Sequence, residues 1–386
     1  MLQKRIAEKS SRKFVRAAFV LVLMQANATL AEGIAVQSER MPVRVETVAS
    51  ELEHPWSVAF LPDGRMLVTE RPGRMRIISG TGELSAPLKG LPAVAARGQG
   101  GLLDVALAPD FEKSQQVFWS YAEQRADGSG TTVARGRLVG DSLENVKVIF
   151  RQTPAVDSNG HFGSRLVFAR DGALFVTLGE RQARHFAVRA QDLETHFGKV
   201  VRLDRDGKAL PDNPFLRVPG AQPEIWSYGH RNVQGAALHP QTGELWTVEH
   251  GPKGGDEINI ARAGANYGWP LVTYGVAYSG EVLGVGAERE GIVKPVKYWV
   301  PSIATTGLAF YTGDRLEQWR GNIFVGGLYG MLVRLELDGE KVVREERLLT
   351  ELKDRIRDVR QGPDGCLYVL TDSPRGRLLR IDRAAR

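Results

Sequence analysis

A histidine and a glutamate are the side chains of this sequence best suited to moving a proton. His161 lies in the glycine-rich segment 158–165, where its ring would be accessible to a ligand. An imidazole titrates near neutrality, which suits a general base. Glu180 follows nineteen residues later at the end of the next strand-like run, and the two ends of a hairpin can meet. The pair predicts a base with an orienting partner, with a merely solvated loop histidine as the alternative.

Two further clusters could stabilise charge or contact a ligand. Arg231 and Asn232 are adjacent in segment 228–235 and would place a fixed positive charge and an amide at one turn. Such groups stabilise negative charge that develops during a reaction. Gln99 lies in the glycine-rich turn 98–104, where glycines allow the backbone to approach a ligand closely. Both clusters are also compatible with ordinary surface turns.

A fourth cluster contains the best candidates for metal binding. Asp256 and Glu257 follow a glycine- and proline-rich loop at 251–255, and Asn-Tyr-Gly-Trp-Pro comes soon after at 266–270. Carboxylates and backbone carbonyls are the hard oxygen ligands that Ca²⁺ prefers. The segment therefore predicts a calcium site, with a solvated acidic turn as the alternative.

The elements that must position these residues are short strands. Six times, a turn containing Asp, Gly or Pro leads into an apolar strand-like run, at 61–69, 108–121, 170–178, 239–248, 312–326 and 362–370. Such repetition is typical of blades stacked around an axis, which bury their faces and leave few free edges. We predict an all-β fold, a six-bladed β-propeller of four-stranded antiparallel blades over residues 32–386. Segment 43–50 could pair with the last blade and close the ring; a β-sandwich would not explain six turn signals.

The first 31 residues differ in composition from the rest. They carry six basic side chains against one acidic, then an apolar run at 17–24 and small residues up to Ala31. This pattern predicts a secretory signal peptide at 1–31 and a periplasmic protein. The apolar run is shorter than the roughly 20 residues that cross a bilayer, so we expect no stable membrane span; a retained amphipathic anchor is the alternative.

Charge and cysteine content exclude several classes of protein. Without residues 1–31 the formal charge of +6 falls to about +1, which removes the main support for nucleic-acid binding. The single cysteine, Cys366, excludes an intrachain disulfide and a multi-cysteine metal site.

The four clusters, in this order, resemble those of the soluble quinoprotein glucose/sorbosone dehydrogenase family. The likeness is greatest to the bacterial aldose sugar dehydrogenases that use pyrroloquinoline quinone (PQQ). It covers residues 53–382 and is strongest at Glu-His-Gly-Pro-Lys-Gly-Gly-Asp-Glu-Ile-Asn (249–259), at 266–270, and at Arg-Ile-Arg-Asp-Val (355–359). The family fold is a six-bladed propeller, in agreement with the repeats.

The resemblance implies roles for the residues of the first three clusters. His161 matches the catalytic base that takes the proton of the sugar's anomeric hydroxyl, and Glu180 matches the acid that orients it. Gln99 matches a glutamine near quinone and substrate. Arg231 and Asn232 match the pair that contacts the quinone.

The resemblance also implies how the cofactor and two Ca²⁺ ions are held. Arg355 and Arg357 match arginines that bind the carboxylates of the cofactor, a task that suits planar bidentate donors. The matching metal ligands are the carbonyls of Gly251 and Pro252 for the Ca²⁺ against PQQ, and Glu257 with the carbonyl of Tyr267 for a second, structural Ca²⁺.

The implied activity is PQQ- and calcium-dependent oxidation of aldose sugars at C1 to the lactone, with hydride passing to PQQ. The expected partners are an aldose substrate and an electron acceptor that the sequence does not identify; the protein would be a monomer or a homodimer. A metal-dependent lactonase on a six-bladed propeller and a non-enzymatic binding propeller are the competing hypotheses.

Overall fold

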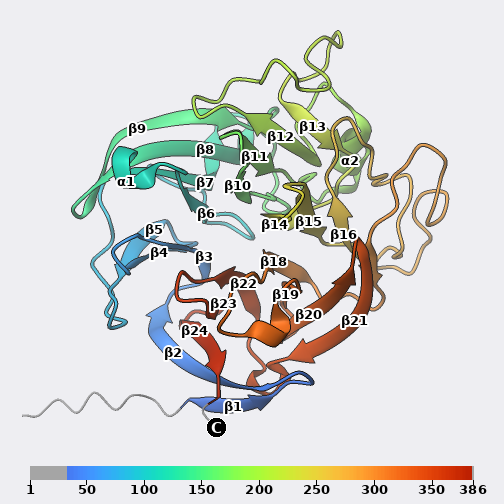
Figure 1. The fold of residues 1–386 in the computed structure, drawn as a ribbon. Helices are drawn as coiled ribbons and strands as arrows, with labels where there is room; N and C mark the ends of the chain where they lie inside the picture. Colours follow the sequence, from blue (N-terminus) through green and yellow to red (C-terminus); the bar gives the residue numbers. More distant parts are fainter. Residues whose placement is uncertain (1–32, 385–386) are drawn as a thin grey trace, which may run out of the picture. The chain divides into compact units, whose positions relative to one another are not determined.

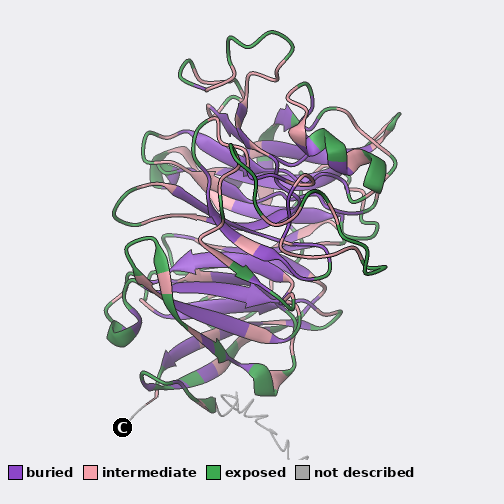
Figure 2. Cartoon of the chain, turned by 90° about the vertical axis from the view of Figure 1, so that its right-hand side faces the viewer, coloured by how far each residue is buried: buried purple, intermediate pink, exposed green. Residues whose placement is uncertain are grey.

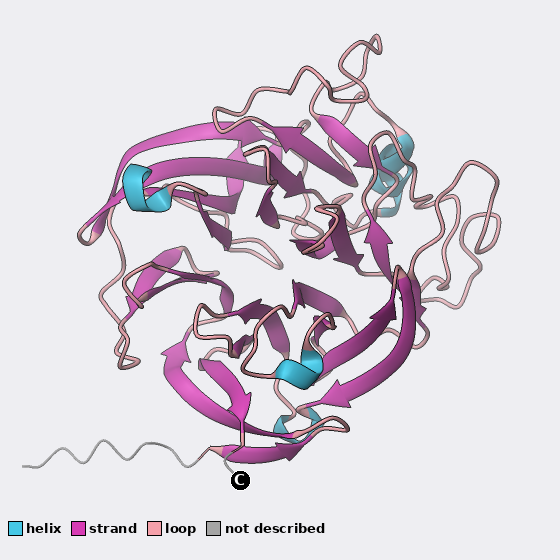
Figure 3. Cartoon of the chain, in the orientation of Figure 1, coloured by secondary structure: helices cyan, strands magenta, loops and turns pink. Residues whose placement is uncertain are grey.

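The fold consists of six antiparallel sheets arranged in a ring (Figures 1 and 3). The structure is a computed structural model that describes residues 33–384; the predicted signal peptide, residues 1–31, lies outside the described residues. The six-bladed propeller predicted from the repeats is confirmed. Within the described residues, no helix is long and apolar enough to cross a membrane.

We number the blades in chain order. Blade 1 contains β3 (Pro55–Phe60), β4 (Met66–Glu70) and β5 (Arg74–Ile78), and blade 2 contains β6 (Leu102–Leu107), β7 (Gln116–Arg125), β8 (Gly128–Val139) and β9 (Ser142–Arg151). Blade 3 contains β10 (Leu166–Phe168), β11 (Leu174–Thr177), β12 (Lys199–Leu203) and β13 (Ile225–Tyr228), and blade 4 contains β14 (Val233–Leu238), β15 (Leu245–Glu249), β16 (Asp256–Ile260) and β17 (Lys297–Trp299).

Blade 5 contains β18 (Thr305–Phe310), β19 (Ile323–Gly327), β20 (Met331–Asp338) and β21 (Lys341–Leu348). Blade 6 contains β22 (Ile356–Gln361), β23 (Leu367–Thr371) and β24 (Gly376–Arg383), with β2 (Pro42–Leu52) and β1 (Ile34–Gln37) added at its outer edge. Blade 1 has three strands, and a bridge between Ile78 and Leu84 stands where a fourth would begin.

The predicted turns join the first and second strands of the blades. Gly64 and Gly172, both at φ +86°, close these turns in blades 1 and 3, in a conformation that glycine adopts without strain. The second strands that follow, β4, β11, β15, β19 and β23, are buried along their whole length. Neighbouring blades cover both faces of these strands, as the continuous buried layers in Figure 2 show, which explains why their sequences are apolar runs rather than alternating ones.

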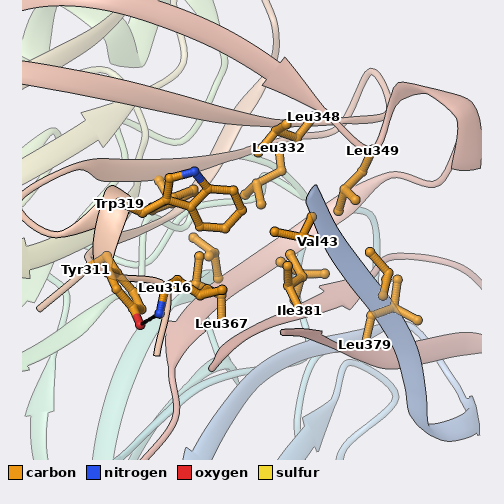
Figure 4. Packing of buried hydrophobic residues seen from close by; sticks show 14 of the residues in the cluster. Val43, Tyr311, Leu316, Trp319, Leu332, Leu348, Leu349, Leu367, Leu379 and Ile381 are labelled. Carbon is orange, nitrogen blue, oxygen red and sulfur yellow. Dashed lines mark hydrogen bonds between the residues drawn. The ribbon is translucent and has the colours of Figure 1, made fainter. Parts of the chain in front are cut away.

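The N-terminal strand β2 closes the ring, as predicted for segment 43–50. It pairs with the C-terminal strand β24, with Val45 opposite Ile381. Val43 packs with Leu379 and Ile381 in a buried cluster that extends to Trp319 of blade 5 (Figure 4). Each such buried side chain contributes about 1.5–3 kcal/mol, so β2 and β24 are held together by apolar burial as well as by hydrogen bonds.

A buried ion cluster links blades around the axis. Asp104 accepts hydrogen bonds from Arg165 at 2.9 Å, from Arg360 at 3.0 Å and from the Ser57 hydroxyl at 2.6 Å. Arg165 and Arg360 also pair with Asp358 at 3.2 and 2.9 Å. These residues come from blades 1, 2 and 6 and from the segment that enters blade 3, so the cluster fixes the relative positions of four blades.

Candidate active site

One cavity of about 340 Å³ brings together six of the residues singled out from the sequence. Its lining includes the predicted residues Gln99, His161, Arg231, Asn232, Arg355 and Arg357. Trp56, Arg71, Gln182, Gln234, His250 and Asp372 also line it. These side chains lie before or at the start of the first strand of a blade, or after the end of the second. Because these two strands are antiparallel, both positions lie at the same face of the ring, opposite the predicted turns.

His161 is held in place by contacts to its ring and to its backbone. The residue is buried and has a φ of +45°, a left-handed conformation that costs energy for a residue with a Cβ. Its Nδ1 lies 3.0 Å from Oε1 of the buried Glu180, and its backbone N–H donates to Oε1 of Gln99 at 2.9 Å. A carboxylate at Nδ1 selects the tautomer that carries its proton there, which leaves Nε2 able to accept one.

The charge of His161 is set by opposing influences. Burial lowers the pKa of the imidazole, Glu180 raises it, Arg231 lowers it again, and the net direction is downward. The ring is therefore neutral at neutral pH, which is the state that a general base requires. The expected pairing of His161 with Glu180 is present in the geometry.

Arg231 lies in the turn between β13 and β14 and is fixed at both ends. Its backbone N–H donates to Oε2 of Glu249 at 2.6 Å, and its Nη1 donates to the Gly251 carbonyl at 2.6 Å. The guanidinium carbon lies 5.1 Å from the centre of the Trp269 ring. The Arg231 carbonyl accepts from the N–H of Glu180 at 2.9 Å, so the guanidinium and the His161–Glu180 pair are tied together.

Asn232 forms a second connection between the Arg231 turn and the loop that carries His161. Its Oδ1 accepts the N–H of Gly163 at 3.1 Å, and Gly163 belongs to the loop that carries His161. In this structure the amide therefore holds the histidine loop. Together these contacts bring a neutral imidazole and a fixed cation into one cavity.

The other polar part of the cavity is rich in arginine. Nη2 of Arg357 donates to Oδ2 of Asp372 at 2.5 Å and its Nη1 donates to Gln234 at 2.8 Å, while Arg355 lies 3.4 Å from the same Asp372 oxygen. Burial alone would raise the pKa of Asp372, but Arg357, His54 and Arg71 outweigh it and lower the pKa well below its usual range. The carboxylate is thus an ionised anchor for the arginines.

The cavity has an excess of positive charge over negative charge, and some of its hydrogen-bonding groups have no partner within the protein. Four arginines line it, and Asp372 is the one acid in its lining. Nε of Arg71, Arg231 and Arg357 and Nε2 of His250 are buried without a hydrogen-bond partner. Unpaired buried polar atoms are costly, so this pattern fits a bound anion with several acceptor oxygens.

Comparison with known proteins identifies the family of the chain. The family model described as glucose/sorbosone dehydrogenase matches residues 52–380. The chain belongs to this family. It is therefore an oxidoreductase of the sugar dehydrogenase type, as the sequence resemblance implies.

Several glucose/sorbosone dehydrogenase relatives match over nearly their whole length. Aldose sugar dehydrogenase YliI of Escherichia coli is 48% identical over 346 residues, which cover 88% of this chain and 92% of the relative. Quinoprotein glucose dehydrogenase B of Acinetobacter calcoaceticus is 27% identical, with 85% of each chain covered.

Two solved structures are similar throughout. The apo form of the soluble aldose sugar dehydrogenase from Escherichia coli is 47% identical, has a TM-score of 0.86, and covers 89% of this chain and 100% of that one. The PQQ-bound aldose sugar dehydrogenase from Streptomyces coelicolor is 28% identical, has a TM-score of 0.71, and covers 88% and 98%.

The expected ligands of the first Ca²⁺ lie beside the cavity and are not part of its lining. The Gly251 carbonyl accepts from Arg231, and Pro252 lines an adjoining cavity of about 490 Å³ that shares Arg231 with the first. Asp256 is one of the two acids singled out in this loop, and both of its carboxylate oxygens already accept hydrogen bonds from nearby protein groups. It accepts from the N–H of Gly251, the Ser302 hydroxyl, and the N–H groups of Ile303 and Ala304.

The expected ligands of the second Ca²⁺ surround a small internal space. Glu257 and Tyr267 line a void of about 10 Å³ together with Glu249. Nδ2 of Asn259 donates to both glutamates, at 3.1 and 3.2 Å, while its Oδ1 is buried without a partner. Burial, followed by the neighbouring Glu249, raises the pKa of Glu257. Two crowded carboxylates and an unpaired oxygen fit a divalent cation, although no group of three His, Cys, Asp or Glu side chains suited to a metal occurs in residues 33–384.

The sequence interpretation missed several residues of the cavity. Arg71, His250, Leu328 and Asp372 line it, and each directly follows the second strand of its blade. Glu180 lies slightly further beyond the end of the second strand of blade 3, β11. Aligning the repeat units on these strands would have found them, because the same position lines the cavity in blades 1, 4, 5 and 6.

Proposed function

We propose that the protein is a PQQ- and calcium-dependent dehydrogenase that oxidises aldose sugars at C1 to the lactone. The observation that carries the proposal is one cavity that holds a neutral, carboxylate-oriented histidine beside an excess of arginine N–H groups without partners. The first feature suits proton removal from a hydroxyl, and the second suits a polycarboxylate cofactor. The predicted signal peptide supports a periplasmic location.

The residues of the chain divide the reaction between them. When bound, PQQ supplies a two-electron acceptor that takes a hydride from C1 of the sugar. Nε2 of His161 takes the proton of the C1 hydroxyl, so the sugar loses two electrons and two hydrogens and becomes the lactone. Glu180 stabilises the imidazolium that forms, and Arg231 provides a fixed positive charge where negative charge develops.

The remaining residues hold the cofactor and the metals. Arg355 and Arg357 are proposed to bind its carboxylates, with Gln99, Arg231 and Asn232 at the reacting part of the cavity. The carbonyls of Gly251 and Pro252 are proposed to hold one Ca²⁺. Glu257 and the Tyr267 carbonyl are proposed for the second Ca²⁺.

Reconstitution of the purified protein tests this function. After incubation with PQQ and CaCl₂, dye reduction should depend on an added aldose. His161→Ala should lower kcat by about 10²- to 10⁴-fold, the range for loss of a general base. His185→Ala is the matched control, because that side chain is exposed and lies outside the lining of the cavity. Inactivity toward every aldose, with His161→Ala no different from wild type, would overturn the proposal.

The lactonase hypothesis expects side-chain metal ligands near the central axis. The acids found there, Asp104 and Asp358, are instead paired with Arg165 and Arg360. Lactone hydrolysis without added quinone would favour the lactonase. Failure to bind PQQ in a titration would favour the non-enzymatic binding propeller.

A further inference from the structure

Three arginines from two blades gather around a single acid at the cavity. Arg355 and Arg357 belong to blade 6, as does Asp372, whereas Arg71 directly follows β4 of blade 1. Asp372 already accepts from Arg357 and lies 3.0 Å from Nδ1 of His54. One carboxylate with those partners cannot neutralise three guanidinium groups, so this part of the cavity retains excess positive charge.

Arg71 is held so that it presents its side chain to the cavity. Its backbone N–H donates to the carbonyl of His54 at 3.1 Å, and its own carbonyl accepts from the N–H of Leu102 at 3.1 Å. Nη1 donates to the Gly98 carbonyl at 2.9 Å. Nε is buried and has no partner. The side chain is therefore positioned by the protein and left with an unused donor.

We propose that Arg71 binds a carboxylate of the cofactor and is the third arginine of a carboxylate site shared by blades 1 and 6. The inference rests on the proposed function and assigns a residue that the family motifs of the sequence did not include. PQQ carries three carboxylates, and a guanidinium offers parallel N–H donors that match a carboxylate. Bound PQQ then links blade 1 to blade 6, beside the junction where the ring closes.

The first experiment measures PQQ affinity without turnover. Apo protein in CaCl₂ buffer is titrated with PQQ, and quenching of tryptophan fluorescence is followed, since Trp56 lines the cavity. Arg71→Gln should weaken binding by about 10- to 100-fold, the effect of losing a hydrogen-bonded charge pair. Arg71→Lys should lie between the two. Arg65→Gln, in the exposed turn of the same blade, is the matched control and should bind as wild type does.

A second comparison separates carboxylate binding from a positioning role. Loss of Arg71 also removes the bond to Gly98, next to Gln99, and could displace the histidine loop. The trimethyl ester of PQQ lacks the charges, so esterification should cost wild type much more affinity than it costs Arg71→Gln. Equal weakening of PQQ and ester by the substitution would make Arg71 a positioning residue and overturn the proposal.

The same titrations keep the two proposals apart. If wild type binds PQQ and Arg71→Gln binds it equally well, only the assignment of Arg71 fails. If wild type binds neither PQQ nor its ester, the proposed function fails with it. Thermal melting provides a further readout: PQQ should raise the Tm of wild type more than that of Arg71→Gln, because the variant lacks the link to blade 1.

Discussion

His161 is buried between a carboxylate and a guanidinium that affect its charge in opposite ways. Because burial and Arg231 outweigh Glu180, the pKa of the ring lies below the usual 6.5. The imidazole is then uncharged, and able to act as a base, throughout the pH range around 7. This ability to accept a proton is lost only as the pH falls through the lowered pKa. This follows from the contacts around the ring, which its loop sequence alone does not specify.

The pH dependence of activity tests this residue-scale account. We expect the acidic side of the kcat/KM profile to have a midpoint below 6.5. Glu180→Gln removes the charge that raises the pKa of His161, so the midpoint should move further toward acid while kcat decreases. Profiles of wild type and variant, recorded at saturating PQQ, measure both effects. A midpoint that moves toward neutral pH in the variant would contradict this account.

At the scale of the elements, the site depends on how closely strand ends approach one another. Gly179 lies just after the end of β11. A Cβ at this position would lie 2.1 Å from the carbonyl oxygen of His161 and 2.9 Å from Oδ1 of Asn232. The histidine loop therefore packs directly on the backbone of blade 3. A glycine is required here because any side chain would push that loop away.

Gly179→Ala should consequently displace His161 and lower both kcat and Tm. Strain of this kind typically costs about 1–3 kcal/mol of unfolding free energy. Gly80→Ala is the matched control, since a Cβ at that position meets nothing within 4 Å, and it should change neither quantity measurably. Urea denaturation and steady-state kinetics of the two variants provide the comparison. Unchanged kcat in Gly179→Ala would show that the loop has room to adjust.

At the scale of the whole molecule, the ring is held by its closing strand and by the ion cluster at its axis. Asp104 is fully buried and joins Arg165, which precedes blade 3, to Arg360 in β22 of blade 6. Removing one partner from a buried ion cluster leaves the others without full compensation. The cost is then much larger than for a surface pair.

Asp104→Asn should therefore destabilise the protein by about 3–5 kcal/mol, measured by urea denaturation. Asp63→Asn removes a carboxylate from an exposed pair with Arg65 and should cost about 0–1 kcal/mol. A similar midpoint for the two variants would mean that the axial cluster does not hold the blades together.

The sequence by itself determined the fold and much of the site. The repeated turn and strand pattern is local, since a glycine at positive φ and a buried apolar run need only their neighbours in the chain, and it predicted six blades and the closure by β2. The motifs also identified six residues of the cavity, and the hairpin argument predicted that Glu180 meets His161. The signal peptide and the roles of the site residues stay predictions.

Only the tertiary structure decided which distant residues share the cavity. Gln99 bonds to the backbone of His161 across 62 residues, Arg357 to Gln234 across 123, and His54 to Asp372 across 318. It also showed that Asp256 organises its own loop and that Arg71 faces the arginines of blade 6. These pairings arise because the ring brings the first strands of different blades together at its centre and the last blade back to the first, and no local pattern encodes which side chains then lie opposite one another.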